Sequence, residues 1–312
     1  MPGIRVPAFA KINLQLRILG KRPDGYHELR TIFQSISLHD ELELELTRSG
    51  AIELSVEGDE SLAAESSQDN LVYRALDAAR RELNLKAGVR ARLKKVTPVG
   101  RGLGGGSSDA AAALMGLQRL AKREIPTARL IEIGASLGAD VPFFLFGGTA
   151  VGVGRGDEIY PLPDAQKFTV LIVSPRDIAV RTADAYCWLN AQPLGAPAKL
   201  TNPGTTPKLP PLCALCWSPQ EITFSNDFEK AVFPRHPRLA EIKRELLQRG
   251  AAEASLAGSG SAVFGRFQNP AQARRTARTF PQDQVFICET LSRGEYRRAQ
   301  RGRAASGSRS RR

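Results

Sequence analysis

Apolar and polar residues alternate along three stretches in the first hundred residues. The stretch 11–18, KINLQLRI, keeps a period of two and predicts a half-buried strand whose polar face carries Lys11 and Asn13. The same period recurs at 41–46, which reads ELELEL, and again at 52–56. Strands with one wet face are typical of antiparallel sheets, so we expect antiparallel pairing here.

Other segments repeat their apolar residues at helical spacing. A helix is expected over 71–83, where Asn70 precedes the first apolar residue and can act as its N-cap. Turn-rich sequence at 161–164 predicts a domain boundary, and a length of 312 residues allows two domains. Further helices are expected at 130–137, 180–186, 239–247 and 271–278, and short apolar strands at 168–173 and 285–288.

The stretch 98–113 reads PVGRGLGGGSSDAAAA and is the most unusual in the chain. Glycine lets a backbone bend tightly and approach a ligand closely. Ser107, Ser108 or Asp109 can cap the helix that the four alanines favour, which we expect to run to about residue 121. A glycine loop that opens into a helix offers free N–H groups and the positive end of the helix dipole, which suits a polyphosphate.

Three other interpretations of this loop are weaker. A flexible linker would not open into an alanine-rich, leucine-containing helix. The P-loop motif requires Lys before Ser or Thr after its last glycine, and here Gly106 is followed by two serines. The dinucleotide pattern fits Gly100, Gly102 and Gly105, but it requires a buried parallel strand in front. The preceding residues 89–96, VRARLKKV, alternate apolar and basic as a half-exposed antiparallel strand does.

The charge of the chain is unevenly distributed. The net charge is +12, and residues 293–312 hold eight arginines and one glutamate, which leaves +5 for the rest. We expect this segment to be a basic disordered tail without a specific nucleic-acid partner. An arginine-rich nucleic-acid binder with a structural core is the alternative.

Hydropathy and cysteine usage favour a cytoplasmic enzyme. We expect neither a membrane span nor a signal peptide, because no apolar run reaches the roughly 18 residues that a span requires and the N-terminus lacks the charged-then-apolar pattern. Four cysteines do not predict a disulfide framework. The C-x-x-C at 213–216 lies in an expected long loop, 191–220, and without a second pair it is interpreted as incidental thiols.

The string 98–112 closely resembles the phosphate-binding motif of the GHMP kinases, the superfamily of galactokinase, homoserine, mevalonate and phosphomevalonate kinases. Its core GLGGGSSDAAA is most similar to one branch, the 4-diphosphocytidyl-2-C-methyl-D-erythritol kinases. The segments 10–29 (AKINLQLRILGKRPDGYHEL), 138–144 (GADVPFF) and 255–264 (SLAGSGSAVF) extend the resemblance. Arg101 departs from it, standing where the family often has a small residue; it either reaches toward phosphate or alters the nucleotide fit.

The resemblance implies an α+β fold of two GHMP kinase domains, each a largely antiparallel sheet covered by helices. The N-terminal domain would span 1–162 and hold the ATP loop and the catalytic residues. The C-terminal domain would span 163–292, and the basic disordered tail 293–312 would follow.

The resemblance also assigns the site residues. Lys11 and Asp140 would be catalytic, although Asp140 can alternatively be a turn-capping residue. Asn70 matches a position beside the adenine pocket, with a plain N-cap as the alternative. The substrate-binding residues would be Asn13, Tyr26, His27 and Tyr186, of which Tyr186 competes with an ordinary amphipathic-helix tyrosine. The ATP-binding residues would be Pro98, Val99, Gly100, Arg101, Gly102, Leu103, Gly104, Gly105, Gly106, Ser107 and Ser108.

The implied reaction is phosphorylation of the 2-hydroxyl of 4-diphosphocytidyl-2-C-methyl-D-erythritol by ATP and Mg²⁺, giving the 2-phosphate and ADP in the non-mevalonate route to isoprenoid precursors. The partner would be a small molecule carrying a cytidine diphosphate group, and the protein a monomer or homodimer. Ser107 or Ser108 would assist Mg²⁺, but no pattern identifies the metal ligands. A homoserine or mevalonate kinase is the nearest alternative, and a dinucleotide-dependent oxidoreductase is a more distant one.

Overall fold

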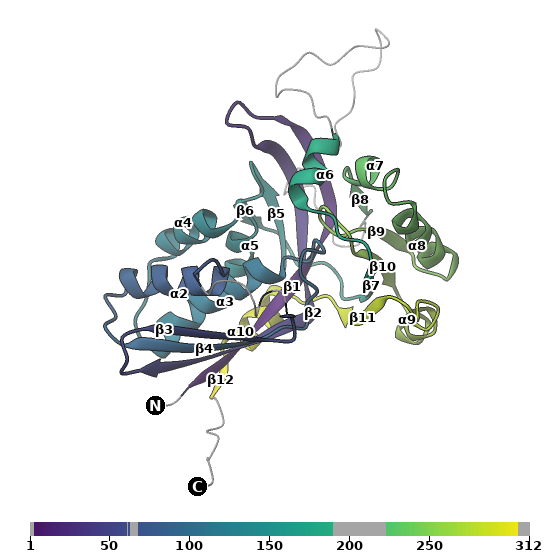
Figure 1. The fold of residues 1–312 in the computed structure, drawn as a ribbon. Helices are drawn as coiled ribbons and strands as arrows, with labels where there is room; N and C mark the ends of the chain where they lie inside the picture. Colours follow the sequence, from purple (N-terminus) through teal and green to yellow (C-terminus); the bar gives the residue numbers. More distant parts are fainter. Residues whose placement is uncertain (1–2, 61, 63–67, 190–222, 305–312) are drawn as a thin grey trace.

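The computed structural model describes residues 3–60, 62, 68–189 and 223–304. Helices, a large sheet, a small sheet and further helices stack as four layers (Figure 1). The larger sheet contains β1 (Ile4–Lys21), β2 (His27–Thr47), β3 (Ile52–Glu57), β4 (Gly88–Lys94), β5 (Thr149–Val153), β6 (Glu158–Pro161), β8 (Ser225–Asn226) and β12 (Arg303–Ala304). The smaller sheet contains β7 (Thr169–Ser174), β9 (Glu253–Leu256), β10 (Val263–Phe267) and β11 (Gln284–Glu289).

Helices cover the outer face of each sheet. On the larger sheet lie α2 (Leu71–Glu82), α3 (Gly105–Leu120), α4 (Thr127–Leu137) and α5 (Val141–Phe146). On the smaller sheet lie α6 (Thr182–Leu189), α7 (Glu229–Val232), α8 (Pro237–Gln248) and α9 (Pro270–Ala277). This arrangement confirms the α+β class and the two-layered organisation of each half that the sequence predicts.

The larger sheet has the strand order β12-β1-β2-β4-β3, with β5 and β8 paired to β2 and β1 respectively. The long strands β1 and β2 form an antiparallel hairpin, and β2 also pairs antiparallel with β4. The prediction of antiparallel pairing is wrong for β3, which runs parallel to β4. The helix α2 lies between these two strands in sequence and returns the chain to the same end of the sheet, so both strands run in one direction.

The smaller sheet is antiparallel throughout, in the order β11-β7-β10-β9. All six residues of β7 are buried, because the larger sheet covers one of its faces and helices cover the other. Between the sheets lies an apolar cluster that includes Ile12 and Leu14 of β1 and Ile172 of β7. The inner position of β7 explains why its sequence is a continuous apolar run.

The middle of β1 is more buried than its alternating sequence predicts. Lys11 and Asn13 are only 3% and 1% exposed, although they lie on the polar face of the strand. The glycine loop contacts this segment, since the Lys11 N–H donates to the Leu103 carbonyl at 3.0 Å. A buried ammonium group requires polar partners, and these define the site described below.

The helix starts differ in how far the sequence anticipates them. Asn70 caps α2 as predicted, its side chain accepting a hydrogen bond from the Val72 N–H. The predicted cap of the next helix at 107–109 is wrong: α3 begins at Gly105, after Gly104 in the left-handed conformation (φ 72°), and no side chain caps it. Glycine tolerates that conformation without strain, so the glycine loop supplies the first turn of the helix itself.

The prediction of a disordered tail over 293–312 is wrong for residues 293–304. Residues Arg293–Gln300 form α10, which begins with a capping box between Ser292 and Glu295. Tyr296 is 1% exposed and donates a hydrogen bond to the Phe144 carbonyl at 2.6 Å. The helix therefore buries one anchored face against the first half of the chain, and β12 then pairs with β1.

Some predictions concern residues that the structure does not describe. The predicted long loop 191–220 lies outside the described residues, together with its C-x-x-C at 213–216. Residues 305–312 also lie outside them. The domain boundary at residue 162 stays a prediction. Within the described ranges, no helix is long and apolar enough to cross a membrane.

We predict that Tyr296→Ala lowers the free energy of unfolding by about 3–5 kcal/mol, because it removes a buried aromatic ring and its hydrogen bond. Urea denaturation measures the change. The exposed neighbour Arg297→Ala is the matched control and should change stability by less than about 0.5 kcal/mol. Equal losses in both variants would show that α10 does not anchor the fold.

Candidate active site

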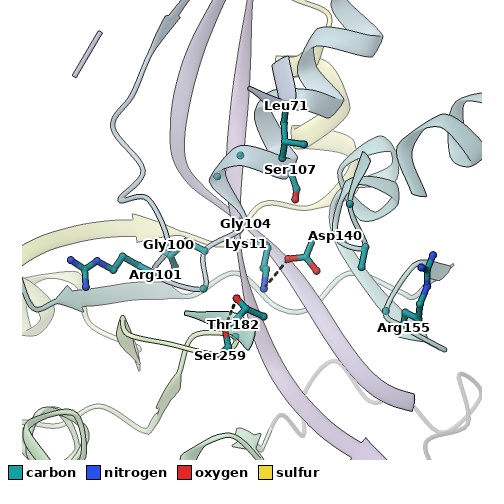
Figure 2. A pocket seen from close by; sticks show the side chains of 18 of the residues that line it. Lys11, Leu71, Gly100, Arg101, Gly104, Ser107, Asp140, Arg155, Thr182 and Ser259 are labelled. Atoms are coloured by element: carbon teal, nitrogen blue, oxygen red, sulfur yellow. Dashed lines mark hydrogen bonds and ion pairs between the residues drawn. The ribbon is translucent and has the colours of Figure 1, made fainter. Parts of the chain in front are cut away.

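A cleft of about 1450 Å³ opens between the glycine loop, the strand β1 and the helix α6. Lys11 and Asp140 line it, as do the four predicted substrate-binding residues. Figure 2 shows the loop residues, Lys11 and Asp140 gathered around one space. Of the predicted ATP-binding residues, Ser108 alone does not line the cleft; the lining members are Pro98, Val99, Gly100, Arg101, Gly102, Leu103, Gly104, Gly105, Gly106 and Ser107.

Lys11 and Asp140 meet although they are 129 positions apart in the sequence. The Lys11 Nζ lies 3.4 Å from the Asp140 Oδ2, and the two side chains are 4% and 33% exposed (Figure 2). The strand β1 presents the lysine, and the turn before α5 presents the aspartate. The Asp140 side chain makes no capping hydrogen bond to α5, so the turn-capping alternative finds no support.

Asn13 holds Lys11 in place from two residues along the same strand. The Lys11 Nζ donates to the Asn13 Oδ1 at 2.7 Å, and the Asn13 Nδ2 donates to the Thr31 Oγ1 at 2.7 Å. Both ends of the Asn13 amide are thus occupied. In this structure Asn13 orients the ammonium group, and its predicted contact with substrate stays a prediction.

The glycine loop packs tightly against a second glycine turn from the smaller sheet. A Cβ on Gly102 (φ +79°) would lie 1.8 Å from the Ala257 carbonyl oxygen, and one on Gly258 would lie 3.4 Å from the Lys11 Nζ. On its other side, a Cβ on Gly104 would lie 2.8 Å from the Phe144 ring. The absence of side chains is therefore what allows the loop, the turn and Lys11 to converge.

The start of α3 has the features of an anion site. The first intrahelical acceptor is the Gly104 carbonyl, which receives the Ser108 N–H, so the N–H groups of the first three helical residues have no partner within the helix. The two serines at the start of this helix, Ser107 and Ser108, have different surroundings. The Ser108 Oγ donates to the Phe9 carbonyl at 2.7 Å and is buried, whereas Ser107 lines the cleft near Asp140 (Figure 2).

Aromatic side chains gather at the other end of the cleft. The rings of His27 and Tyr186 stack with their centroids 4.6 Å apart, and Phe228 meets Tyr186 edge-on at 4.9 Å. Tyr26 is 56% exposed and lies against the Arg155 guanidinium at 5.0 Å. Burial and the nearby charge of Lys21 lower the pKa of His27, which favours the neutral form of its ring. Flat rings and a neutral imidazole are suited to a nucleobase.

Sequence reasoning missed Lys95, Arg155 and Phe228. Lys95 is 7% exposed, and its Nζ lies 2.5 Å from the Asp40 Oδ2 and 2.7 Å from the Asp109 Oδ2. A Cβ on Gly105 would lie 3.2 Å from that amine, which places the cluster directly behind the glycine loop. A signal for it was present, because the period of two in 89–95 puts Lys95 on the same face as the buried Val89.

The two carboxylates of this cluster share one ammonium group. Burial raises the pKa of Asp109 to about 8, and the neighbouring Asp40 adds to the shift while Lys95 opposes it. Burial alone would lower the pKa of Lys95, but the two carboxylates outweigh it and raise that pKa. Asp40 also accepts the N–H groups of Val96 and Thr97 through its Oδ1. The cluster thus ties the chain that enters the glycine loop to the larger sheet.

We predict that Asp109→Asn stabilises the protein increasingly as pH rises from about 5 to 8.5. A raised native pKa contributes stability that is complete below the usual carboxyl value of 3.8 and is lost as pH passes about 8. The neutral amide has no such dependence. Melting temperatures across this range measure the effect, at roughly 2–4 °C per kcal/mol. The exposed Glu132→Gln is the control and should track wild type; a parallel pH profile for Asp109→Asn would refute the prediction.

We predict that Gly102→Ala weakens ATP binding at least about tenfold, because its Cβ would displace the loop from the Ala257 carbonyl. Gly100→Ala is the matched control: it has a similar φ of +69° but no atom within 4 Å of its Cβ. Its cost should be limited to the left-handed strain of about 1–2 kcal/mol in stability. Calorimetric titration with ATP measures the affinity of both variants. Equal affinities would contradict the prediction that the contact of Gly102 with the Ala257 carbonyl matters for ATP binding.

Comparisons with known proteins agree with this geometry. Residues 70–148 match the GHMP kinases N terminal domain and residues 214–284 the GHMP kinases C terminal domain. The chain is 44% identical to a 4-diphosphocytidyl-2-C-methyl-D-erythritol kinase of Solibacter usitatus, covering 93% of this chain and 89% of that one. It is 38% identical to the kinase of the same name from Pelotomaculum thermopropionicum, covering 91% and 97%.

A solved structure supports the same relationship. The crystal structure of a 4-(cytidine 5'-diphospho)-2C-methyl-D-erythritol kinase superposes with a TM-score of 0.73 at 32% identity, over 92% of this chain and 99% of that chain. This chain belongs to the 4-diphosphocytidyl-2-C-methyl-D-erythritol kinase family of the GHMP kinases.

Proposed function

We propose that this protein transfers the terminal phosphoryl group of ATP to the 2-hydroxyl of 4-diphosphocytidyl-2-C-methyl-D-erythritol, a step of the non-mevalonate route to isoprenoid precursors. The observation that carries the proposal is the Lys11–Asp140 pair, 3.4 Å apart, beside a glycine loop at a helix N-terminus. The name shared by the curated relatives supplies the substrate. The aromatic cluster of His27 and Tyr186 supports a cytosine at the far end of the cleft.

The phosphates of ATP would lie on the free N–H groups at the start of α3. These donors and the helix dipole attract the anion without a side-chain cation. Because Gly105 and Gly106 carry no side chains, the phosphates can approach the backbone closely. The helix thereby directs the terminal phosphate toward the space between Ser107 and Asp140.

Asp140 would accept the proton of the substrate hydroxyl as its oxygen bonds to the terminal phosphorus. The bond from that phosphorus to the bridging oxygen then breaks, and ADP leaves. The positive charge of Lys11, whose Nζ lies 3.4 Å from the Asp140 Oδ2, would stabilise the negative charge on the phosphoryl oxygens. Since the ammonium group is buried and held by Asn13, it requires little reorganisation during the reaction.

The residues present fit a Mg²⁺ ion that is bound mainly through ATP. No group of three His, Cys, Asp or Glu side chains able to hold a metal lies within the described ranges. Ser107 and Asp140 offer oxygen donors to the same space, and Mg²⁺ in kinases takes one or two protein oxygens besides phosphate and water. When bound, the ion neutralises charge on the phosphate oxygens.

The remaining expectations for the molecule stay predictions. These are a cytoplasmic location, a monomeric or homodimeric state, and no specific nucleic-acid partner. The helix α10 takes up part of the arginine-rich segment that raised the nucleic-acid alternative, and that helix buries Tyr296 and Gln300. The alternative of a homoserine or mevalonate kinase is tested by substrate choice.

We predict turnover of 4-diphosphocytidyl-2-C-methyl-D-erythritol, but not of homoserine or mevalonate, in a coupled ADP-release assay. Lys11→Ala and Asp140→Asn should each lower kcat/KM by on the order of 10²-fold or more, because each removes a preorganised charged group. Lys94→Ala, an exposed lysine on β4, is the matched control and should leave the rate unchanged. Absence of turnover by folded wild-type protein, or full activity of Lys11→Ala, would refute the proposal.

A further inference from the structure

Arg101 lies in the glycine loop, but its side chain extends away from Lys11 and Asp140 (Figure 2). The Nη1 donates to the Ser261 Oγ at 2.7 Å, and the Nη2 approaches the Arg176 carbonyl at 3.3 Å. Both partners belong to the segments that follow strands of the smaller sheet. The charge on Arg101 is thus directed at the second half of the chain and not at the space where phosphate would lie.

Ser261 continues this connection. It is fully buried, and its Oγ donates to the Ile178 carbonyl at 2.6 Å. Arg176 and Ile178 lie in the segment between β7 and α6. The Arg101 side chain and Ser261 therefore hold this segment at two of its carbonyl groups, four and six residues before the first residue of α6, Thr182.

The helix α6 is held to the same region at its first residue. The hydroxyls of Thr182 and Ser259 share a hydrogen bond of 3.0 Å (Figure 2). Tyr186 lies four residues, or about one turn, further along the helix and stacks on His27 in the aromatic cluster. A continuous series of contacts thus runs from the glycine loop through Arg101 and Ser261 to the residues predicted to bind the substrate.

We propose that Arg101 is a positioning residue that couples the ATP loop to α6, so that binding of ATP and binding of the cytidine-bearing substrate favour one another. This inference rests on the proposed function. The main-chain contacts between the two glycine turns, such as Ala262 N–H to the Arg101 carbonyl at 3.3 Å, do not reach the segment before α6. Ser261 bonds the second glycine turn to this segment at Ile178, and the Arg101 side chain connects the ATP loop to it through Ser261 and the Arg176 carbonyl.

Binding measurements test the coupling directly. We expect a non-hydrolysable ATP analogue to bind wild-type protein at least about fivefold more tightly when 4-diphosphocytidyl-2-C-methyl-D-erythritol is present, and the substrate to gain by the same factor. Arg101→Ala should reduce this factor to between about one and two. Arg101→Lys should restore part of it through a single hydrogen bond to Ser261.

Arg176→Ala is the matched control, because it removes an exposed side chain and keeps the carbonyl that Arg101 contacts. It should retain the wild-type coupling factor. In the rate assay, Arg101→Ala should raise both KM values while kcat changes less than about twofold, which a general loss of folded protein would not produce. Unchanged coupling in Arg101→Ala with weaker ATP binding alone would overturn the proposal and assign Arg101 to phosphate.

Amide hydrogen exchange of the ligand-free protein tests this inference independently of the proposed function. Amides of 176–186 should exchange faster in Arg101→Ala than in wild type or Arg176→Ala, because the segment before α6 loses an anchor. Equal exchange in all three proteins would overturn the inference even if the kinase activity is present. Absence of turnover by wild-type protein would refute the proposed kinase function. Faster exchange in Arg101→Ala would still show that the Arg101 side chain holds the segment before α6.

Discussion

A buried ammonium group imposes the principal demand on this structure. Lys11 is almost completely enclosed, and removing its charge from water is costly unless polar partners surround it. Asn13 supplies one partner within the strand and Asp140 supplies another from a distant turn. A glycine turn lies on a further side of the amine, where a Cβ on Gly258 would lie 3.4 Å from the Lys11 Nζ. A buried cation beside a glycine loop is suited to an anionic ligand, which agrees with the proposed phosphoryl transfer.

The shape of the site depends on the close packing of the two glycine turns. Gly102 lies in the loop after β4 of the larger sheet, and Gly258 lies in the turn after β9 of the smaller one. Their backbones approach so closely that little or no room remains for a Cβ on either residue. Neither sheet contains the site alone. Lys11 and Asp140 belong to the larger sheet and its helices, whereas the turn that covers them and the helix bearing Tyr186 belong to the smaller one. The chemistry thus depends on how the two sheets pack through their shared apolar cluster.

Further contacts outside the cleft hold the glycine loop in place. Lys95, Asp40 and Asp109 tie its entry strand and its helix to the larger sheet, with Lys95 bonded to both carboxylates. At the opposite side, α10 returns from the end of the chain and anchors Tyr296 on the carbonyl of Phe144 in α5, the helix that follows Asp140. These contacts restrict the glycine loop and the segment around Asp140, and such preorganisation favours the proposed phosphoryl transfer.

Local sequence was sufficient to predict much of the fold, and all but one of the predicted site residues line the cleft. The period of two in β1, the helical spacing after Asn70 and the density of glycine before α3 each act within a few residues, so they can be interpreted without long-range contacts. The period of two also runs through 89–95 and puts Lys95 on the inward face of its strand, although Lys95 was not predicted as a site residue. The resemblance of 98–112 to the GHMP motif added the chemical role of the loop.

Other properties arise only when distant segments pack together. The parallel pairing of β3, the complete burial of Lys11 and the folding of α10 each depend on a partner far along the chain. The same holds for the 3.4 Å approach of Lys11 to Asp140, since no local pattern encodes the distance between two side chains on different elements. Backbone propensities and hydrophobic periodicity describe a residue's own neighbourhood, whereas burial and electrostatic pairing are set by whatever the rest of the chain brings beside it.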